Sequence, residues 1–190
     1  MTRIETIASI EAAPEGSRAG LEAVARQLGS VPNLFRVVAN SPAALGGLLG
    51  LEGAASKGRL GARTLERIAL AVAEVNACGY CLSAHTYIAR NLAKLDDAEI
   101  TANRNGLSND PQAAAAVRFA VQIAQARGHV SDAQVAAARA AGFDDAQLVE
   151  IVQAVVLNTY TNYINEVART QIDFPVVGAE LAVDGGLAQI

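Results

Sequence analysis

The only two cysteines of the chain lie inside a stretch of helical apolar periodicity, residues 65–92, which restricts the possible folds most. Apolar residues recur at steps of three and four before and after the cysteines: Leu65, Ile68, Ala69, Val72 and Val75, then Leu82, Ala84, Ile88, Ala89 and Leu92. This spacing predicts two helices rather than the strand that precedes the CxxC of a thioredoxin-type βαβ unit. The break at residues 76–79 predicts that one helix ends and the next begins there, with Asn76 as a possible N-cap.

The cysteines are accompanied by one of only two histidines. Cys78, Cys81 and His85 stand at positions i, i+3 and i+7, so they share one face of the predicted second helix. Helical residues three apart have Cα atoms about 5 Å apart, which a disulfide accepts, so the pair can open and close without unfolding the helix. The field of the helix N-terminus favours a thiolate at Cys78, whereas His85, one turn away, favours Cys81.

Composition favours a single all-α domain. The 190 residues are 52% hydrophobic but only 4% aromatic, and abundant alanine suits closely packed helices. A net charge of -4 argues against a nucleic-acid partner. The absence of a long apolar run argues against a membrane partner, and the acidic first residues argue against a signal peptide. Two cysteines spaced as a redox pair suit a cytoplasmic location.

Caps and periodicity predict further helices along the chain. The expected ranges are 16–28, 34–40, 43–56, 95–105, 112–126, 132–140 and 146 to about 164 or beyond, the last with Leu148, Ile151, Val152, Val155, Val156 and Leu157 buried. The glycine-rich range 43–56 is expected either to allow close approach of a neighbouring subunit or to be loosely structured. The apolar tail, residues 176–190, is expected to lie over the body or over a neighbouring protomer. Both features predict a homo-oligomer.

The order Glu66, eleven residues, Cys78-x-x-Cys81, three residues, His85 resembles the signature of the alkyl hydroperoxidase D (AhpD) branch of the carboxymuconolactone decarboxylase superfamily. The segment Val31–Phe35 and the chain length resemble its peroxidase-related members. In that branch the second cysteine attacks a peroxide, the first forms a disulfide with it, and Glu and His relay protons. The resemblance therefore implies that Cys81 is the nucleophile and Cys78 the resolving thiol, with Glu66 and His85 as the relay. Before the second cysteine, where some members have a histidine, this chain has Tyr80.

The same resemblance implies an AhpD-like helical bundle with two degenerate repeats within one domain, residues 1–190. The active repeat is expected at about 41–106 and the inactive one at about 110–175. A shift of 84 residues aligns Glu66 with Glu150, and the two cysteines with Asn162 and Asn165. The implied substrate is an alkyl or organic hydroperoxide, the implied reductant a lipoyl- or thioredoxin-type dithiol protein, and no cofactor is expected.

Several alternatives remain open from the residues alone. Cys78, Cys81, His85 and Glu66 together could bind zinc, because thiolate, imidazole and carboxylate are all zinc ligands. A decarboxylase or lactone-acting enzyme would leave the thiols unexplained, and a redox sensor would form the disulfide without turnover. Other polar residues are interpreted more simply: Glu74 as solvated, His129 as a surface loop residue, Tyr80 and Tyr87 as pocket walls or core. The polar run Asn158, Tyr160, Asn162 and Asn165 is expected to line either an interface or a pocket.

Overall fold

The structure is a computed structural model that describes residues 2–180, which form nine α-helices and no strand. The helices are α1 (Glu15–Leu28), α2 (Asn33–Val38), α3 (Pro42–Ala55), α4 (Ala62–Val75), α5 (Gly79–Asn91), α6 (Asp97–Arg104), α7 (Pro111–Ala126), α8 (Asp132–Ala140) and α9 (Asp145–Ala168). The predicted all-α class is confirmed. No helix within residues 2–180 has both the length and the apolar character that a membrane span requires.

Short polar side chains start most of the helices, as the sequence predicts. Ser41, with Pro42 at the first helical position, caps α3, and Asp110 caps α7 in the same way. Ser131 and Asp144 form capping boxes with the glutamines three residues later, at the start of α8 and α9. The glycine-rich range 43–56 is therefore helical, and the loosely structured alternative is wrong.

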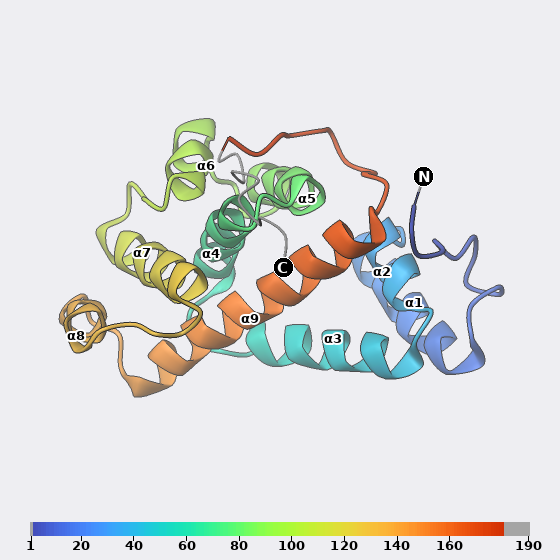
Figure 1. Cartoon of the computed structure of the whole chain (residues 1–190), viewed down its shortest axis with the longest axis horizontal. Coiled ribbons are helices and arrows are strands. Elements are labelled where there is room, and N and C mark those ends of the chain that lie inside the picture. The colour runs from blue at the N-terminus through green and yellow to red at the C-terminus, as the bar shows by residue number, and fades with distance from the viewer. Residues whose placement is uncertain (1, 181–190) are drawn as a thin grey trace, which may run out of the picture.

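Helix α4 is the centre of the molecule, because it packs against α5, α6, α7 and α9 (Figure 1). Every residue from Arg67 to Glu74 is buried, so this helix has no solvent-facing side over two turns. The long helix α9 crosses in front of it, α3 runs beside α9, and α1 and α2 close one end (Figure 1). One apolar cluster joins α4 to α7, α8 and α9, and another joins α1, α2 and α3 to α5.

Helix α9 differs from the prediction in the face that it buries. Ile151 and Val155 are buried as expected, but Val152 and Val156 are 43% and 54% exposed. The face turned toward the core carries Asn158, Asn162 and Asn165 instead, all with at most 6% exposure. This puts a row of amides inside the bundle.

After α9 the chain passes over α5 as an extended segment, residues 170–180, which we call the C-terminal segment (Figure 1). The Ser83 hydroxyl accepts the Val177 N–H at 2.9 Å, and Arg104 donates to the Gly178 carbonyl at 2.9 Å. Residues 176–180 of the predicted tail thus lie over the body, and residues 181–190 lie outside the described part. The two-repeat organisation within one domain stays a prediction.

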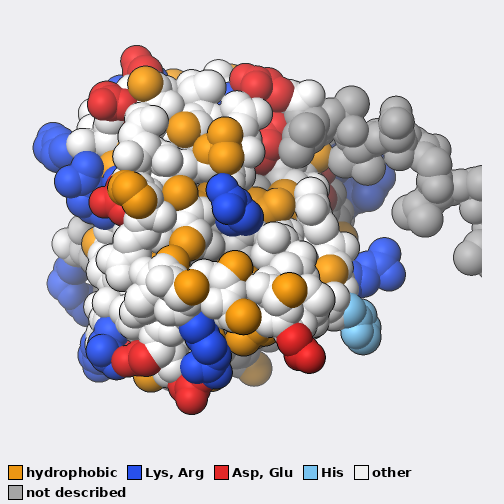
Figure 2. Space-filling model, turned by 90° about the vertical axis from the view of Figure 1, so that its left-hand side faces the viewer, with side chains coloured by type: hydrophobic (Ala, Val, Ile, Leu, Met, Phe, Trp, Pro, Cys, Tyr) orange, Lys and Arg blue, Asp and Glu red, His pale blue; other side chains and the backbone are white. Residues whose placement is uncertain are grey.

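The surface on the α7–α8 side carries basic side chains interspersed with acidic and apolar ones (Figure 2). Among the described residues of this face, no continuous basic surface is visible (Figure 2). His129 lies exposed in the loop after α7, as predicted.

Candidate functional site

The junction between α4 and α5 places the two cysteines at the start of α5. Ala77 adopts a left-handed backbone (φ 50°), which turns the chain before Cys78. Cys78 is the N-cap of α5, and its Sγ accepts the backbone N–H of Cys81 at 3.3 Å. The prediction of Asn76 as N-cap is wrong, because Asn76 is the C-cap of α4 and its amide donates to Asn162 Oδ1 at 2.8 Å.

Both thiols are free and buried, with exposures of 0% for Cys78 and 3% for Cys81. A side-chain hydrogen bond between the two thiols lowers the pKa of Cys81 and raises the pKa of Cys78. Burial opposes the change at Cys81, but the charge of His85 and a hydrogen bond from Asn165 Nδ2, 3.2 Å from Sγ, help to bring its pKa to about 7. The lowered pKa of Cys81 and the raised pKa of Cys78 make Cys81 the thiol that ionises first, chiefly through the hydrogen bond between the two thiols.

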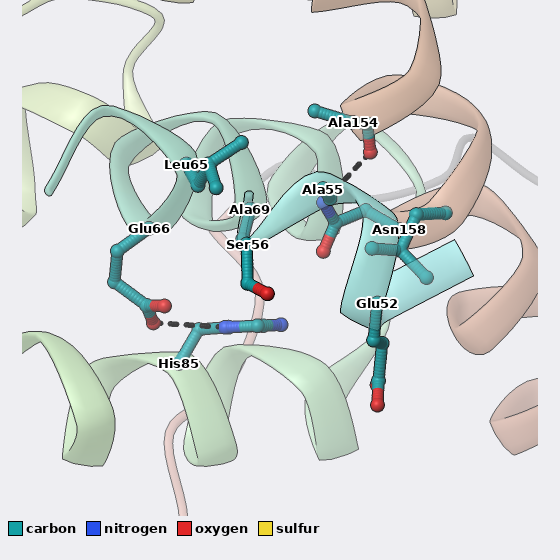
Figure 3. A pocket seen from close by; sticks show the side chains of 10 residues that line it. Glu52, Ala55, Ser56, Leu65, Glu66, Ala69, His85, Ala154 and Asn158 are labelled. Atoms are coloured by element: carbon teal, nitrogen blue, oxygen red, sulfur yellow. Dashed lines mark hydrogen bonds and ion pairs between the residues drawn. The ribbon is translucent and has the colours of Figure 1, made fainter. Parts of the chain in front are cut away.

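His85 and Glu66 form a hydrogen-bonded pair beside the thiols. His85 Nδ1 lies 2.8 Å from Glu66 Oε1, with side-chain exposures of 21% and 13% (Figure 3). Burial lowers the pKa of His85, but the charge and hydrogen bond of Glu66, with the charges of Cys81 and Glu52, outweigh it and raise the pKa to about 9. At neutral pH the ring is an imidazolium held between a carboxylate and an ionisable thiol.

A cavity of about 170 Å³ opens beside this pair, between α3, α4, α5 and α9 (Figure 3). Its walls are mostly apolar, and its polar groups are few: Glu52, Ser56, Glu66, His85 and Asn158. An apolar cavity with a small number of convergent polar groups is the usual form of a small-molecule site. Asn158 therefore lines a pocket, which answers part of the question that the polar run of α9 left open.

Glu52 is a site residue that the sequence did not single out. It extends from α3 across the cavity from Glu66 (Figure 3). Burial raises its pKa to about 7, although the charge of His85 opposes this. One signal was present in the sequence, because Glu52 is the only charged residue in the glycine- and alanine-rich helix α3.

Asn162 and Asn165 lie on the core side of α9 near the CxxC, and Asn158 lies on the same buried side but lines the cavity. Tyr160, by contrast, is 36% exposed. Glu150, which the 84-residue shift aligns with Glu66, accepts the backbone N–H groups of Arg59 and Leu60 and takes no part in the site.

The C-terminal segment covers the start of α5. Tyr80 donates from its hydroxyl to Asp173 at 2.8 Å and accepts the Leu34 N–H at 3.1 Å, while Phe174 packs edge-on against the Tyr80 ring. Tyr80 is buried, whereas Tyr87 is 45% exposed beside Phe174. The tyrosine that replaces a histidine before the second cysteine thus fastens this segment.

A zinc site is not supported by the arrangement of the side chains. Within residues 2–180, no three His, Cys, Asp or Glu side chains are placed to hold one metal ion. The four candidate ligands instead form two pairs, the two thiols and His85 with Glu66.

The chain resembles known proteins in part of its sequence and in its fold. Residues 42–122, from α3 into α7, match the carboxymuconolactone decarboxylase family. No curated protein matches the chain in sequence.

Solved structures share the fold over most of the chain. The AhpD-core, uncharacterized peroxidase-related protein from Ralstonia eutropha JMP134 is 24% identical, with a TM-score of 0.79 over 90% of this chain and 92% of that one. A peroxidase-related protein from Silicibacter sp. TM1040 is 22% identical, with a TM-score of 0.76 over 90% and 94%. The debrominase Bmp8, in complex with 2,3,4-tribromopyrrole, is 15% identical, with a TM-score of 0.74 over 91% and 94%. The chain is thus similar to the carboxymuconolactone decarboxylase family over residues 42–122, and its fold is that of the AhpD-core and peroxidase-related structures.

Proposed function

We propose that the chain is a thiol-dependent peroxidase that reduces alkyl or organic hydroperoxides. The observation that carries the proposal is the environment of Cys81, whose pKa is lowered to about 7 beside a second thiol and the His85–Glu66 pair. A thiolate is the nucleophilic form of cysteine, and at a pKa of about 7 roughly half of Cys81 is thiolate at neutral pH. The apolar cavity beside His85 suits a small organic substrate better than a charged one.

The first step consumes the peroxide. The Cys81 thiolate attacks one peroxide oxygen, the O–O bond breaks, and the sulfur is oxidised by two electrons to a sulfenic acid. The departing alkoxide needs a proton, and the His85 imidazolium, whose pKa is raised to about 9, can donate it while Glu66 stabilises its charge. His85 thus acts as a proton donor in this step.

The second step forms a disulfide between Cys78 and Cys81. Cys78, whose raised pKa keeps it a thiol, attacks the Cys81 sulfenic acid, forming the disulfide and releasing water. A dithiol protein of the lipoyl or thioredoxin type then reduces the disulfide by exchange. Each cycle moves two electrons from the dithiol to the peroxide and gives one alcohol and one water.

The test separates the two cysteines. With one equivalent of cumene hydroperoxide and a sulfenate trap, Cys78→Ser should accumulate a trapped sulfenic acid at Cys81, detected by mass spectrometry. Cys81→Ser should consume no peroxide, because a serine hydroxyl remains protonated at neutral pH. A trapped sulfenic acid on Cys78 in the Cys81→Ser protein would reverse the assignment. Disulfide formation without steady-state peroxide consumption would favour a redox sensor.

The electron acceptor needs its own control, because a debrominase shares this fold. The same thiol chemistry can be assayed with a brominated pyrrole in place of the peroxide, following bromide release. Faster turnover with the brominated pyrrole than with any hydroperoxide would replace the peroxidase proposal by a dehalogenase. A carboxymuconolactone decarboxylase activity that survives in the Cys81→Ser protein would reject both.

A further inference from the structure

Asn162 holds a buried amide whose orientation is set by a neighbour. The residue is fully buried on α9, and its Oδ1 accepts a hydrogen bond from Asn76 Nδ2 at 2.8 Å. Because the carbonyl end is engaged, the Nδ2 end is directed elsewhere, and among the described residues it makes no hydrogen bond of normal geometry. A buried donor without an acceptor is costly, so native structures retain one mainly where it has a purpose.

The Cys81 sulfur lies near this donor, because Asn162 is among the groups whose hydrogen bonding lowers the pKa of Cys81. Asn165, three residues further along α9 and 2% exposed, donates from Nδ2 to Cys81 Sγ at 3.2 Å. Residues three apart on a helix share a face, so both amides approach the same side of the sulfur. The Asn162 amide contributes to lowering the pKa of Cys81 without making a bond of normal geometry to the reduced thiol.

We infer that Asn162 and Asn165 form a two-amide site that positions Cys81 and binds the oxygen it gains on oxidation. Asn165 supplies a hydrogen bond to the thiolate of the resting protein. The Nδ2 of Asn162 can then donate to an oxygen bound to that sulfur, because the oxygen projects further from the cysteine than Sγ does. The Asn165 role needs only the thiolate, whereas the Asn162 role rests on the proposed peroxidase function.

The predicted repeat, in which residues 84 apart are aligned, pairs the two asparagines with the two cysteines. That shift aligns Cys81 with Asn165, and these two residues are hydrogen-bonded in the structure. In the predicted second repeat, the positions aligned with the two cysteines are Asn162 and Asn165, the residues of the proposed two-amide site. Amides suit the task, because they donate hydrogen bonds without carrying a titrating charge.

The Asn165 role is tested without peroxide. In a Cys78→Ser background, which leaves one thiol, the rate of Cys81 alkylation by iodoacetamide is followed from pH 5 to 10 in buffers of constant ionic strength. Asn165→Leu should raise the midpoint and slow alkylation at pH 7 by about tenfold, as expected for one lost hydrogen bond to an ionised group. Thr161→Val is the matched control, since the buried Thr161 hydroxyl donates only to Asn158 O of its own helix.

An unchanged midpoint in folded Asn165→Leu protein would overturn the Asn165 role, even if the melting temperature fell. Should the leucine variant fail to fold, Asn165→Asp keeps the side-chain shape. It should raise the midpoint further, because a carboxylate repels the thiolate.

The Asn162 role is tested on the oxidised protein. In the same Cys78→Ser background, one equivalent of cumene hydroperoxide is added, and the Cys81 sulfenic acid is trapped after increasing delays. Asn162→Leu should shorten the sulfenic acid lifetime by about tenfold and increase the sulfinic product, whereas Thr161→Val should not. An equal lifetime in Asn162→Leu would overturn this role. If no sulfenic acid forms in any variant, the proposed function and the Asn162 role both fail, and the alkylation profile still decides the Asn165 role.

Discussion

The charge of Glu66 should control the protonation of His85, and Glu66→Gln isolates that charge. Glutamine keeps the side-chain length and an oxygen that can still accept from His85 Nδ1, now 2.8 Å from the carboxylate. Only the negative charge is lost. Burial, which is the largest single influence on this ring and lowers its pKa, is then opposed by the remaining hydrogen bond and by the charges of Cys81 and Glu52, but no longer by the charge of Glu66.

The expected effect is a fall in the pKa of His85 from about 9 to its ordinary 6.5 or below. At pH 7.5 this change lowers the protonated fraction from roughly 97% to about 10%. Only about a tenth of the rings then carry the proton that the departing alkoxide needs, so the peroxide step should slow by about tenfold at pH 7.5.

The assay is a proton NMR titration of the imidazole C–H signals. The chain has only two histidines, so His129→Gln assigns the signal of His85. Glu52→Gln is the matched control. It removes a carboxylate from the same cavity that makes no hydrogen bond to the ring, and it should lower the pKa of His85 less. A midpoint above 8 in Glu66→Gln would refute the reasoning, because it would show that Glu66 does not supply the stabilising charge.

Two further predictions concern the thiols and the assembly. The pKa of Cys81 is lowered from 9.0 to about 7, so its ionisation adds folding stability that is fully present above pH 9 and lost as the pH falls to 7. Relative to wild type, Cys81→Ser should therefore become less stable by up to about 3 kcal/mol between pH 7 and 9 in urea unfolding; a difference independent of pH would contradict the lowered pKa. Apart from its own helix backbone, a Cβ at Gly50 would meet no atom of residues 2–180 within 4 Å, so Gly50→Leu should leave the monomer folded but reduce the mass of the predicted homo-oligomer in light scattering. A monomeric wild type at micromolar concentration would remove that prediction.

Local chemistry explains why much of the fold could be predicted from the sequence. A cap such as Ser131 acts on N–H groups within its own first turn, so the residues that form it are adjacent in the chain. The spacing of Glu66, Cys78, Cys81 and His85 could likewise be recognised. The structure brings His85 to Glu66 and Cys81 to Cys78 as the resemblance implied. Their chemical roles remain proposals.

Contacts between distant helices explain what the sequence could not show. The sequence alone allowed Asn76 to be an N-cap, but in the fold its side-chain amide donates to Asn162 Oδ1 of α9 at 2.8 Å. The apolar residues of α9 occur on two faces, so periodicity could not decide whether Val152 or Asn158 faces the core. Glu52 becomes a site residue only because α3, which packs against α9, lines the same cavity as His85.

Glu74 was predicted to be solvated because it lies away from the apolar stripe of α4, but a helix surrounded on all sides has no solvated face. Glu74 is 2% exposed, and its carboxylate accepts Arg104 Nε at 2.8 Å and the Glu180 N–H at 2.5 Å. Removing one partner of a buried ion pair leaves the other charge poorly solvated, which costs about 3–5 kcal/mol, whereas a surface pair contributes less than about 1 kcal/mol. We therefore expect Glu74→Met to lower the free energy of unfolding by about 3 kcal/mol. Glu74→Met combined with Arg104→Met should recover most of that loss, because neither charge is then buried alone. A loss below 1 kcal/mol in the single variant, measured by urea unfolding at pH 7, would show that solvent or Glu180, whose Oε1 lies 3.4 Å from Arg104, compensates the charge, and that the pairing of Arg104 with Glu74 contributes little to stability.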